Sequence, residues 1–232
     1  MRCDKTYTLH LPMKAKALLL ALTLSFIASL QAADVIVLNS TPKGNKIRME
    51  GTSTLHDWQV GGSLIGGTAE VGPDFPLKPG AAVKPGPVQA KVNVFIPVQQ
   101  LKSVEKDGTP YKASMDQRMY EEMKEPANKR ITYTLTSLTL KEEPKAADQP
   151  YTFESVGELC VAGVTNKITM PVSVTVLEEN KVKFAGSTTV KMTDFKMTPP
   201  ALTVLGLGIK TGDDVKLFFE WVAVKRSAPA AK

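Results

Sequence analysis

The segment Gly157–Val176, with the sequence GELCVAGVTNKITMPVSVTV, decides the fold. Its second half places Val172, Val174 and Val176 alternately with serine and threonine. Successive side chains of a β-strand point to opposite faces, so this period of two predicts a strand with one buried face. A helix would instead repeat its apolar residues three and four positions apart.

The same alternation recurs along most of the chain, and threonine, valine and isoleucine dominate it, as strand propensity prefers. The order of about eight to ten strands with short turns favours an all-β sandwich or an antiparallel barrel. A barrel would close the edges of so many strands. The other predicted strands are Asn45–Glu50, Gly51–Trp58, Ser63–Val71, Val92–Val98, Ile131–Thr136, Tyr151–Val161, Lys181–Phe195 and Val215–Trp221.

One segment, Lys112–Glu125, has helical periodicity instead. Met115, Met119 and Met123 fall four residues apart and therefore share one face, and Pro126 ends the predicted helix. The methionines either pack into the core or form the adaptable wall of an apolar ligand pocket. Both interpretations stay open at this point.

A second distinct segment, Gly72–Pro87, contains five of the 16 prolines. Proline cannot donate to a sheet ladder, so this segment is predicted to be an extended loop between strands.

The N-terminal segment has the features of a secretory signal peptide. Ala17–Leu30 carries no charge, follows four basic residues and leads into small residues. We therefore predict a cleaved signal at residues 1–33, with Met13 as an alternative start, and a single domain at residues 34–232. Fourteen apolar residues are too few to span a bilayer, which needs about 20, so no integral membrane segment is expected after cleavage. The expected location is the periplasm, with secretion as the alternative.

The composition of the 232 residues, 43% hydrophobic and 22% charged, is that of a folded protein. Cleavage removes four of the 29 basic residues and one of the 23 acidic ones, which lowers the net charge from +6 to +3. The remaining charges are spread along the chain, whereas a nucleic-acid-binding surface would be a basic cluster. We therefore expect no nucleic-acid partner.

The mature chain keeps one cysteine, Cys160, and one histidine, His56. This predicts no disulfide, no metal centre and no cofactor, because zinc usually needs three or four protein ligands. The densest polar cluster is His56-Asp57-Trp58; in a strand the first two would point to opposite faces and would not form a dyad. The cluster is either a hydrogen-bonded network that pins a hairpin with Trp58 in the core, or the polar part of a pocket, or a catalytic site. We predict no catalytic residue.

Four segments together resemble the YceI-like family of exported proteins. The third of them is the most specific, and together they extend over most of the mature chain. They are GTSTLHDW (Gly51–Trp58), MYEEMK with RITY (Met119–Lys124 and Arg130–Tyr133), GELCVAGVTNKITMPV (Gly157–Val172), and TDFKMTPP with KTGDDV (Thr193–Pro200 and Lys210–Val215).

The resemblance implies an eight-stranded, lipocalin-like antiparallel barrel with one short helix near the mouth. Such a barrel would hold a polyisoprenoid or fatty-acid-like lipid for transport, storage or sequestration, without enzymatic activity; a homodimer is left open. Two segments depart from the family pattern, Gly72–Pro87 and Glu125–Lys129, and both lie in loops that could edge the mouth. The candidate ligand contacts are His56, Trp58, Met115, Met119, Met123, Phe184 and Phe219.

Two alternatives belong to other classes of protein. The first is a stress-response or interaction module whose barrel is filled by its own side chains, because fold does not fix function. The second, less favoured, is an enzyme that uses His56. The volume of the interior distinguishes a filled barrel from a ligand-binding one.

Overall fold

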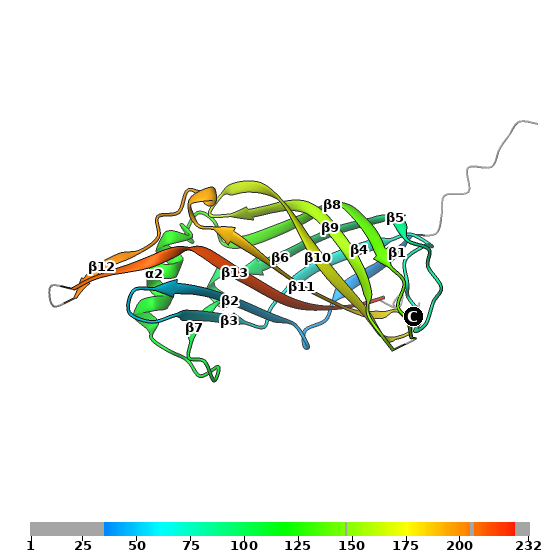
Figure 1. Cartoon of the computed structure of the whole chain (residues 1–232), viewed down its shortest axis with the longest axis horizontal. Helices are drawn as coiled ribbons and strands as arrows, with labels where there is room; N and C mark the ends of the chain where they lie inside the picture. Colours follow the sequence, from blue (N-terminus) through cyan, green and yellow to red (C-terminus); the bar gives the residue numbers. More distant parts are fainter. Residues whose placement is uncertain (1–34, 147, 205–206, 226–232) are drawn as a thin grey trace, which may run out of the picture. The chain divides into compact units, whose positions relative to one another are not determined.

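The computed structural model describes residues 35–146, 148–204 and 207–225 (Figure 1). The predicted signal peptide lies outside the described residues. In the described part, one α-helix, α2 (Ala113–Glu122), and two 3-10 turns, η1 (Val98–Gln100) and η2 (Thr193–Phe195), accompany the strands. No helix there has the length and apolar character needed to cross a bilayer. The strands are β1 (Ile36–Ser40), β2 (Lys46–Ser53), β3 (Trp58–Gly62), β4 (Gly66–Val71), β5 (Gly86–Val88), β6 (Ala90–Pro97), β7 (Lys102–Val104), β8 (Arg130–Glu142), β9 (Tyr151–Val161), β10 (Val164–Glu178), β11 (Lys181–Lys191), β12 (Ala201–Val204) and β13 (Leu207–Lys225).

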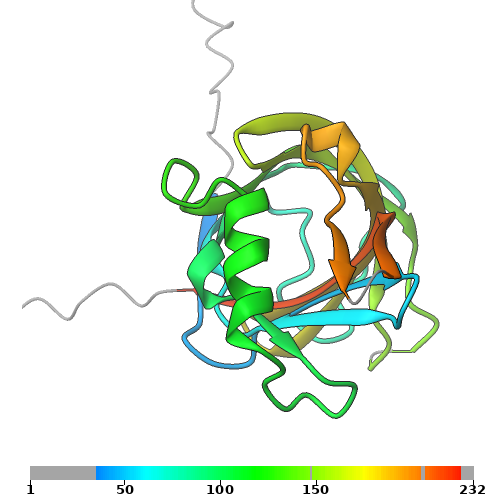
Figure 2. The ribbon, with the colours of Figure 1, turned by 90° about the vertical axis from the view of Figure 1, so that its left-hand side faces the viewer.

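Eight of these strands close into a ring. Their order is β1-β4-β6-β8-β9-β10-β11-β13, and the end of β13 pairs back with β1, all antiparallel. Figure 2 looks along this ring from the end at which α2 lies. The predicted eight-stranded antiparallel barrel with a single short helix is confirmed. Closure of the ring removes the unpaired strand edges that an open sheet would expose.

The last strand, β13, joins two parts of the wall. On one edge it pairs with β11 from Lys181↔Val224 to Lys191↔Asp214. On the other edge it pairs first with β2 and then, from Ala223 to Lys225, with β1. The strands β2, β3 and β7 therefore extend the wall at the end near α2 (Figure 1).

The predicted strand Gly51–Trp58 is wrong. β2 continues through Ser53, residues 54–57 form a turn, and β3 starts at Trp58. The Ser53 hydroxyl stabilises this turn: it accepts the N–H of His56 at 3.2 Å and donates to the carbonyl of His56 at 2.6 Å. A serine side chain thus replaces the glycine or asparagine that usually marks a turn in a sequence.

The proline-rich segment is an extended loop, as predicted, but it closes the end of the barrel opposite α2 (Figure 1). Phe75, only 3% exposed, stacks on Phe153 at a centroid distance of 5.9 Å and packs against Phe184 at 6.0 Å. The expectation that this loop edges the mouth is therefore wrong. Its aromatic side chain finds more apolar surface to bury inside the barrel than at a solvated rim.

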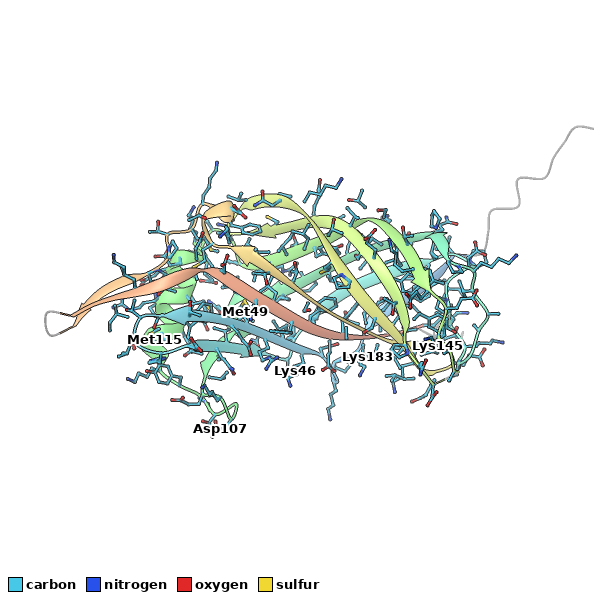
Figure 3. All side chains as sticks on the ribbon, viewed as in Figure 1. Lys46, Met49, Asp107, Met115, Lys145 and Lys183 are labelled. Carbon is cyan, nitrogen blue, oxygen red and sulfur yellow. The ribbon has the colours of Figure 1, made fainter. Side chains whose placement is uncertain are left out.

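A hydrogen bond fixes the same loop to the barrel wall. The hydroxyl of Tyr151, at the start of β9, donates to the carbonyl of Ala81 at 2.6 Å. Figure 3 labels Lys145, in the preceding β8–β9 loop, at this end and Met115 at the opposite one. The barrel therefore has a closed end at the proline-rich loop and a mouth at α2.

Candidate binding cavity

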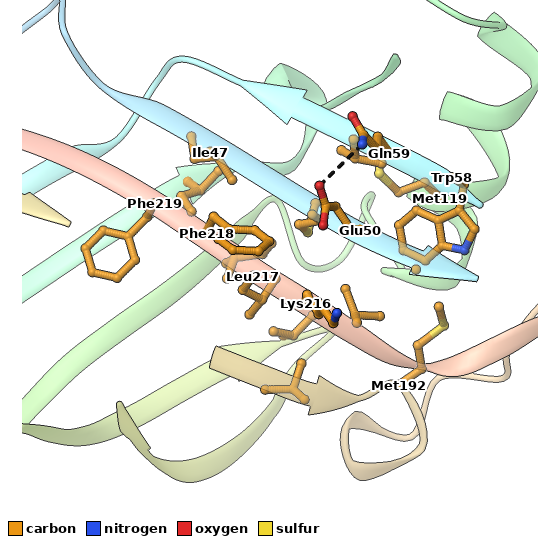
Figure 4. A pocket seen from close by; sticks show the side chains of 18 of the residues that line it. Ile47, Glu50, Trp58, Gln59, Met119, Met192, Lys216, Leu217, Phe218 and Phe219 are labelled. Atoms are coloured by element: carbon orange, nitrogen blue, oxygen red, sulfur yellow. Dashed lines mark hydrogen bonds between the residues drawn. The ribbon is translucent and has the colours of Figure 1, made fainter. Parts of the chain in front are cut away.

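The barrel interior is a cavity of about 1630 Å³ lined mainly by apolar side chains. It runs from α2 at the mouth to Phe184 and Trp221 near the closed end. Figure 4 shows Trp58, Met119, Leu217 and Phe219 among the lining side chains. The interior is therefore not filled by the side chains of the described residues.

Two aromatic side chains leave the lumen open because they lie against glycines of neighbouring strands. Trp58 faces Gly51 directly across the β2–β3 hairpin, and a Cβ at Gly51 would collide with its indole ring. Phe219 likewise faces Gly186, where a Cβ would lie 2.8 Å from its ring. A glycine has no side chain to hold such a ring away from the sheet, so the ring can lie against the barrel wall.

A polar pair lies within this apolar wall. The ring of Tyr133 extends from β8 across Gly157 of β9, and its hydroxyl lies 2.7 Å from the Ser155 hydroxyl. All three residues alternate inward on their strands, and Tyr133 and Ser155 both line the cavity. Burial raises the pKa of the Tyr133 hydroxyl, so this group stays protonated at neutral pH.

A β-bulge keeps the second half of β8 apolar on its inner face. The pairing of β8 with β9 shifts register between Leu135 and Ser137, and both Leu135 and Leu138 line the cavity. Without the shift, the alternation from Ile131 would turn Leu138 to the outside. A bulge of this kind re-aims the following side chains.

All seven candidate ligand contacts predicted from the sequence line the cavity. His56, Trp58, Met115 and Met119 lie toward the mouth, and Phe184 lies at the closed end. Their contact with a ligand stays a prediction. The polar pair Tyr133–Ser155 was not among them, although the alternation of β8 places Tyr133 on the inner face. The complete set is His56, Trp58, Met115, Met119, Met123, Phe184 and Phe219.

His56 lies exposed in the β2–β3 turn rather than in a strand. Its Nδ1 lies 2.8 Å from the carbonyl of Asp57, and its ring meets Tyr111 edge to face at 6.0 Å. Trp58 is half-buried, and its Nε1 donates to the carbonyl of Thr52 at 3.2 Å. Within the described residues no carboxylate orients the imidazole, and no three histidine, cysteine, aspartate or glutamate side chains gather to hold a metal ion.

Polar bonds attach α2 to one side of the mouth. The Asp116 carboxylate accepts the N–H of Ser103 at 2.6 Å and its hydroxyl at 2.7 Å, while Lys102 lies 3.5 Å away. Met115 and Met119 are half-buried and line the cavity, whereas Met123, just after the helix, is only 8% exposed. The helix therefore presents a methionine wall to the interior while Asp116 holds it on β7.

The turn η2 borders the mouth on another side. The Thr193 hydroxyl and N–H donate to the Asp213 carboxylate at 2.7 and 2.9 Å and hold the pKa of that carboxyl below its usual value. Met192 and Phe195 of this segment are buried and line the cavity. Asp213 thus fixes apolar residues at the rim.

A closed eight-stranded antiparallel barrel with an apolar interior open at one end is a lipocalin-like barrel. Within that class the chain belongs to the YceI-like family, because the model of the YceI-like domain matches residues 41–223. A comparison with curated protein sequences found no match.

Two of the solved structures that match this chain share its fold. BcnA of Burkholderia cenocepacia is 13% identical with a TM-score of 0.55, and the alignment covers 78% of this chain and 96% of that one. A domain from Saccharophagus degradans, described as a polyisoprenoid binding domain implicated in plant cell wall breakdown, is 9% identical with a TM-score of 0.55. Its alignment covers 83% of this chain and 100% of that one. At these identities the likeness concerns the fold.

Proposed function

We propose that this chain is a periplasmic protein that binds one long apolar ligand, a polyisoprenoid or a fatty-acid-like lipid, for transport, storage or sequestration. The observation that carries the proposal is the apolar cavity of about 1630 Å³ inside the barrel. A dry cavity of roughly 150 Å³ holds one benzene molecule, so this interior has room for a chain of several tens of carbon atoms. Each CH₂ group moved from water into it contributes about 0.8 kcal/mol.

The shape of the cavity suggests how the ligand lies. It enters past Met115 and Met119, whose flexible side chains adapt to different chains. The far end of the ligand reaches Phe184, and its middle runs along Phe219. The description of the Saccharophagus degradans domain as polyisoprenoid binding supports this ligand class.

Two alternatives are less well supported. A barrel filled by its own side chains does not agree with the volume left between the described residues. An enzyme built on His56 would need an orienting partner for the imidazole. In the described residues the imidazole contacts the backbone carbonyl of Asp57 and the ring of Tyr111 instead.

Native mass spectrometry of the full chain, purified from the periplasm without detergent, tests the binding. We expect an apolar adduct in the wild type. Val94→Trp, on the inner face of β6, narrows the lumen and should reduce the adduct while the barrel stays folded. Asn93→Trp, exposed on the outer face of the same strand, is the matched control and should keep it. A wild-type protein that is bare and does not take up a polyprenol or a long-chain fatty acid overturns the proposal.

Export has a separate test. Expressed from Met1, the protein should appear in the periplasmic fraction with a mature N-terminus close to residue 34. A chain that remains in the cytoplasm with its first 33 residues attached contradicts export but leaves the ligand-binding proposal untouched.

A further inference from the structure

The hydroxyl pair of Tyr133 and Ser155 stands out in an interior that is otherwise apolar at this level. The other inward residues of the two strands beside the pair are Leu135, Gly157 and Leu159. Ser155 is only 3% exposed, whereas Tyr133 keeps part of its surface open to the cavity. Tyr133 is therefore the member of the pair that a ligand can reach.

The two hydroxyl groups carry one proton more than the hydrogen bond between them uses. Two hydroxyl groups carry two protons, and the 2.7 Å bond between their oxygens uses one of them. Neither hydroxyl makes another hydrogen bond among the described residues. If Ser155 donates to Tyr133, the Tyr133 proton is left without an acceptor inside an apolar cavity, which is unfavourable until an acceptor arrives.

We propose that the Tyr133 hydroxyl donates a hydrogen bond to an uncharged oxygen of the bound ligand, such as a carbonyl. The inference rests on the proposed binding function and deepens it. The ligand is then an apolar chain that carries a neutral polar group partway along the barrel, rather than a plain hydrocarbon. Gly157 makes the interaction possible, because any side chain there would displace the Tyr133 ring.

The inner faces of β8 and β9 also favour a ligand whose polar group is neutral. The inward residues of β8 and β9 include no charged side chain. A carboxylate or phosphate at this depth would lose its hydration without gaining a counter-ion, which costs far more than a hydrogen bond returns. The raised pKa of Tyr133 agrees with a group that acts as a donor and stays protonated.

Competition binding with two probes tests the inference. A long-chain ketone and the alkane of equal length each displace a fluorescent long-chain fatty acid from the delipidated full chain. Tyr133→Phe should lower the ratio of ketone affinity to alkane affinity about tenfold relative to the wild type, the effect of one hydrogen bond to an otherwise unpaired buried donor. The change should come from weaker ketone binding alone, because the alkane makes no hydrogen bond in either protein. Tyr151→Phe, which removes a hydroxyl that bonds Ala81 and does not line the cavity, should keep the wild-type ratio.

The outcomes are distinguishable. An unchanged ratio of ketone affinity to alkane affinity in Tyr133→Phe overturns the role of Tyr133 while lipid binding stands. If the wild type binds neither the fatty acid nor the two competitors, the proposed function itself fails. Alkane binding by Tyr133→Phe is the control for the fold of the variant, because the alkane makes no hydrogen bond in either protein.

Discussion

The indole of Trp58 lies against Gly51, its direct partner across the β2–β3 hairpin. Phe219 and Gly186 repeat this relationship between β13 and β11. These two large side chains are thus laid along the sheet where a neighbouring strand offers no side chain. The width of the lumen depends on these glycines as much as on the residues that touch a ligand.

A methyl group at Gly186 tests this relationship. Its Cβ would lie 2.8 Å from the Phe219 ring and 2.8 Å from the carbonyl oxygen of Pro171, and the backbone oxygen cannot turn away. Gly186→Ala should therefore destabilise the protein by about 1–3 kcal/mol in denaturant unfolding, the range for overpacking. Gly61→Ala is the control, because its Cβ would meet Val104 at an ordinary 3.6 Å and should change stability by less than about 0.5 kcal/mol.

The closed end of the barrel should depend strongly on Phe75. This ring is 3% exposed and packs between Phe153 and Phe184. Phe75→Ala should lower the free energy of unfolding by about 3–5 kcal/mol, as for other large core truncations. Pro73→Ala, exposed in the same loop, should have little effect. Equal stability of the two variants in urea would show that the loop is not part of the core.

Asp116 should control how firmly α2 sits on the mouth. Asp116→Ala leaves the N–H and hydroxyl of Ser103 without their acceptor, so we expect a loss of about 1–3 kcal/mol and faster amide exchange in α2. A bound lipid should also dissociate faster. Asp116→Asn keeps an acceptor oxygen in place and should lie between the wild type and the alanine variant. Unchanged amide exchange in Asp116→Ala would contradict this role.

The methionines of the helical face should differ in their effects. Met119 is half-buried at the cavity, whereas Met123 is 8% exposed in the core. Met119→Asp places a charge against the ligand and should reduce lipid retention with the barrel still folded. Met123→Asp buries a charge without a partner and should lower the melting temperature sharply even without ligand. If both variants lost lipid retention and melting temperature to a similar extent, Met119 and Met123 would not have these separate roles.

Acid should loosen the rim at η2 through Asp213. Its pKa is lowered in the folded state by the Thr193 hydroxyl and N–H, so its ionised form stabilises the fold. This contribution is complete above the unfolded-state pKa of about 3.9 and is lost as the pH falls further through the folded-state pKa. The difference in melting temperature between the wild type and Asp213→Asn should thus be constant from about pH 7 to pH 5 and shrink below about pH 4. A difference that grows in acid would be inconsistent with this sign.

Much of the barrel wall could be predicted from local alternation. The predicted strand Tyr151–Val161 has the same bounds as β9, because every inward position from Tyr151 to Val161 is buried. The alternation failed where the chain is irregular. The rest of β8 was not predicted, because the alternation changes face at the bulge after Leu135. The start of β13 was not predicted either, because its pairing with β2 shifts register before Val215.

The site could be predicted only in part, for a physical reason. The seven candidates are large or polar residues on inward positions, and local patterns identify such positions. The pair Tyr133 and Ser155 lies 22 residues apart on two strands, and only the strand register brings the hydroxyl groups together. The closure by Phe75 depends in the same way on contacts with β9 and β11, which local sequence does not specify.

The pairing of β1 with β13 has a consequence for the order of events during biogenesis. Leu38 pairs with Lys225, so the first and last described strands must meet before the ring exists. Contacts between residues so distant in sequence form late and slowly. A chain still emerging from the ribosome or from a translocation channel therefore has no enclosed lumen. The proposed binding of a lipid thus requires that β13, the last described strand, has already been released.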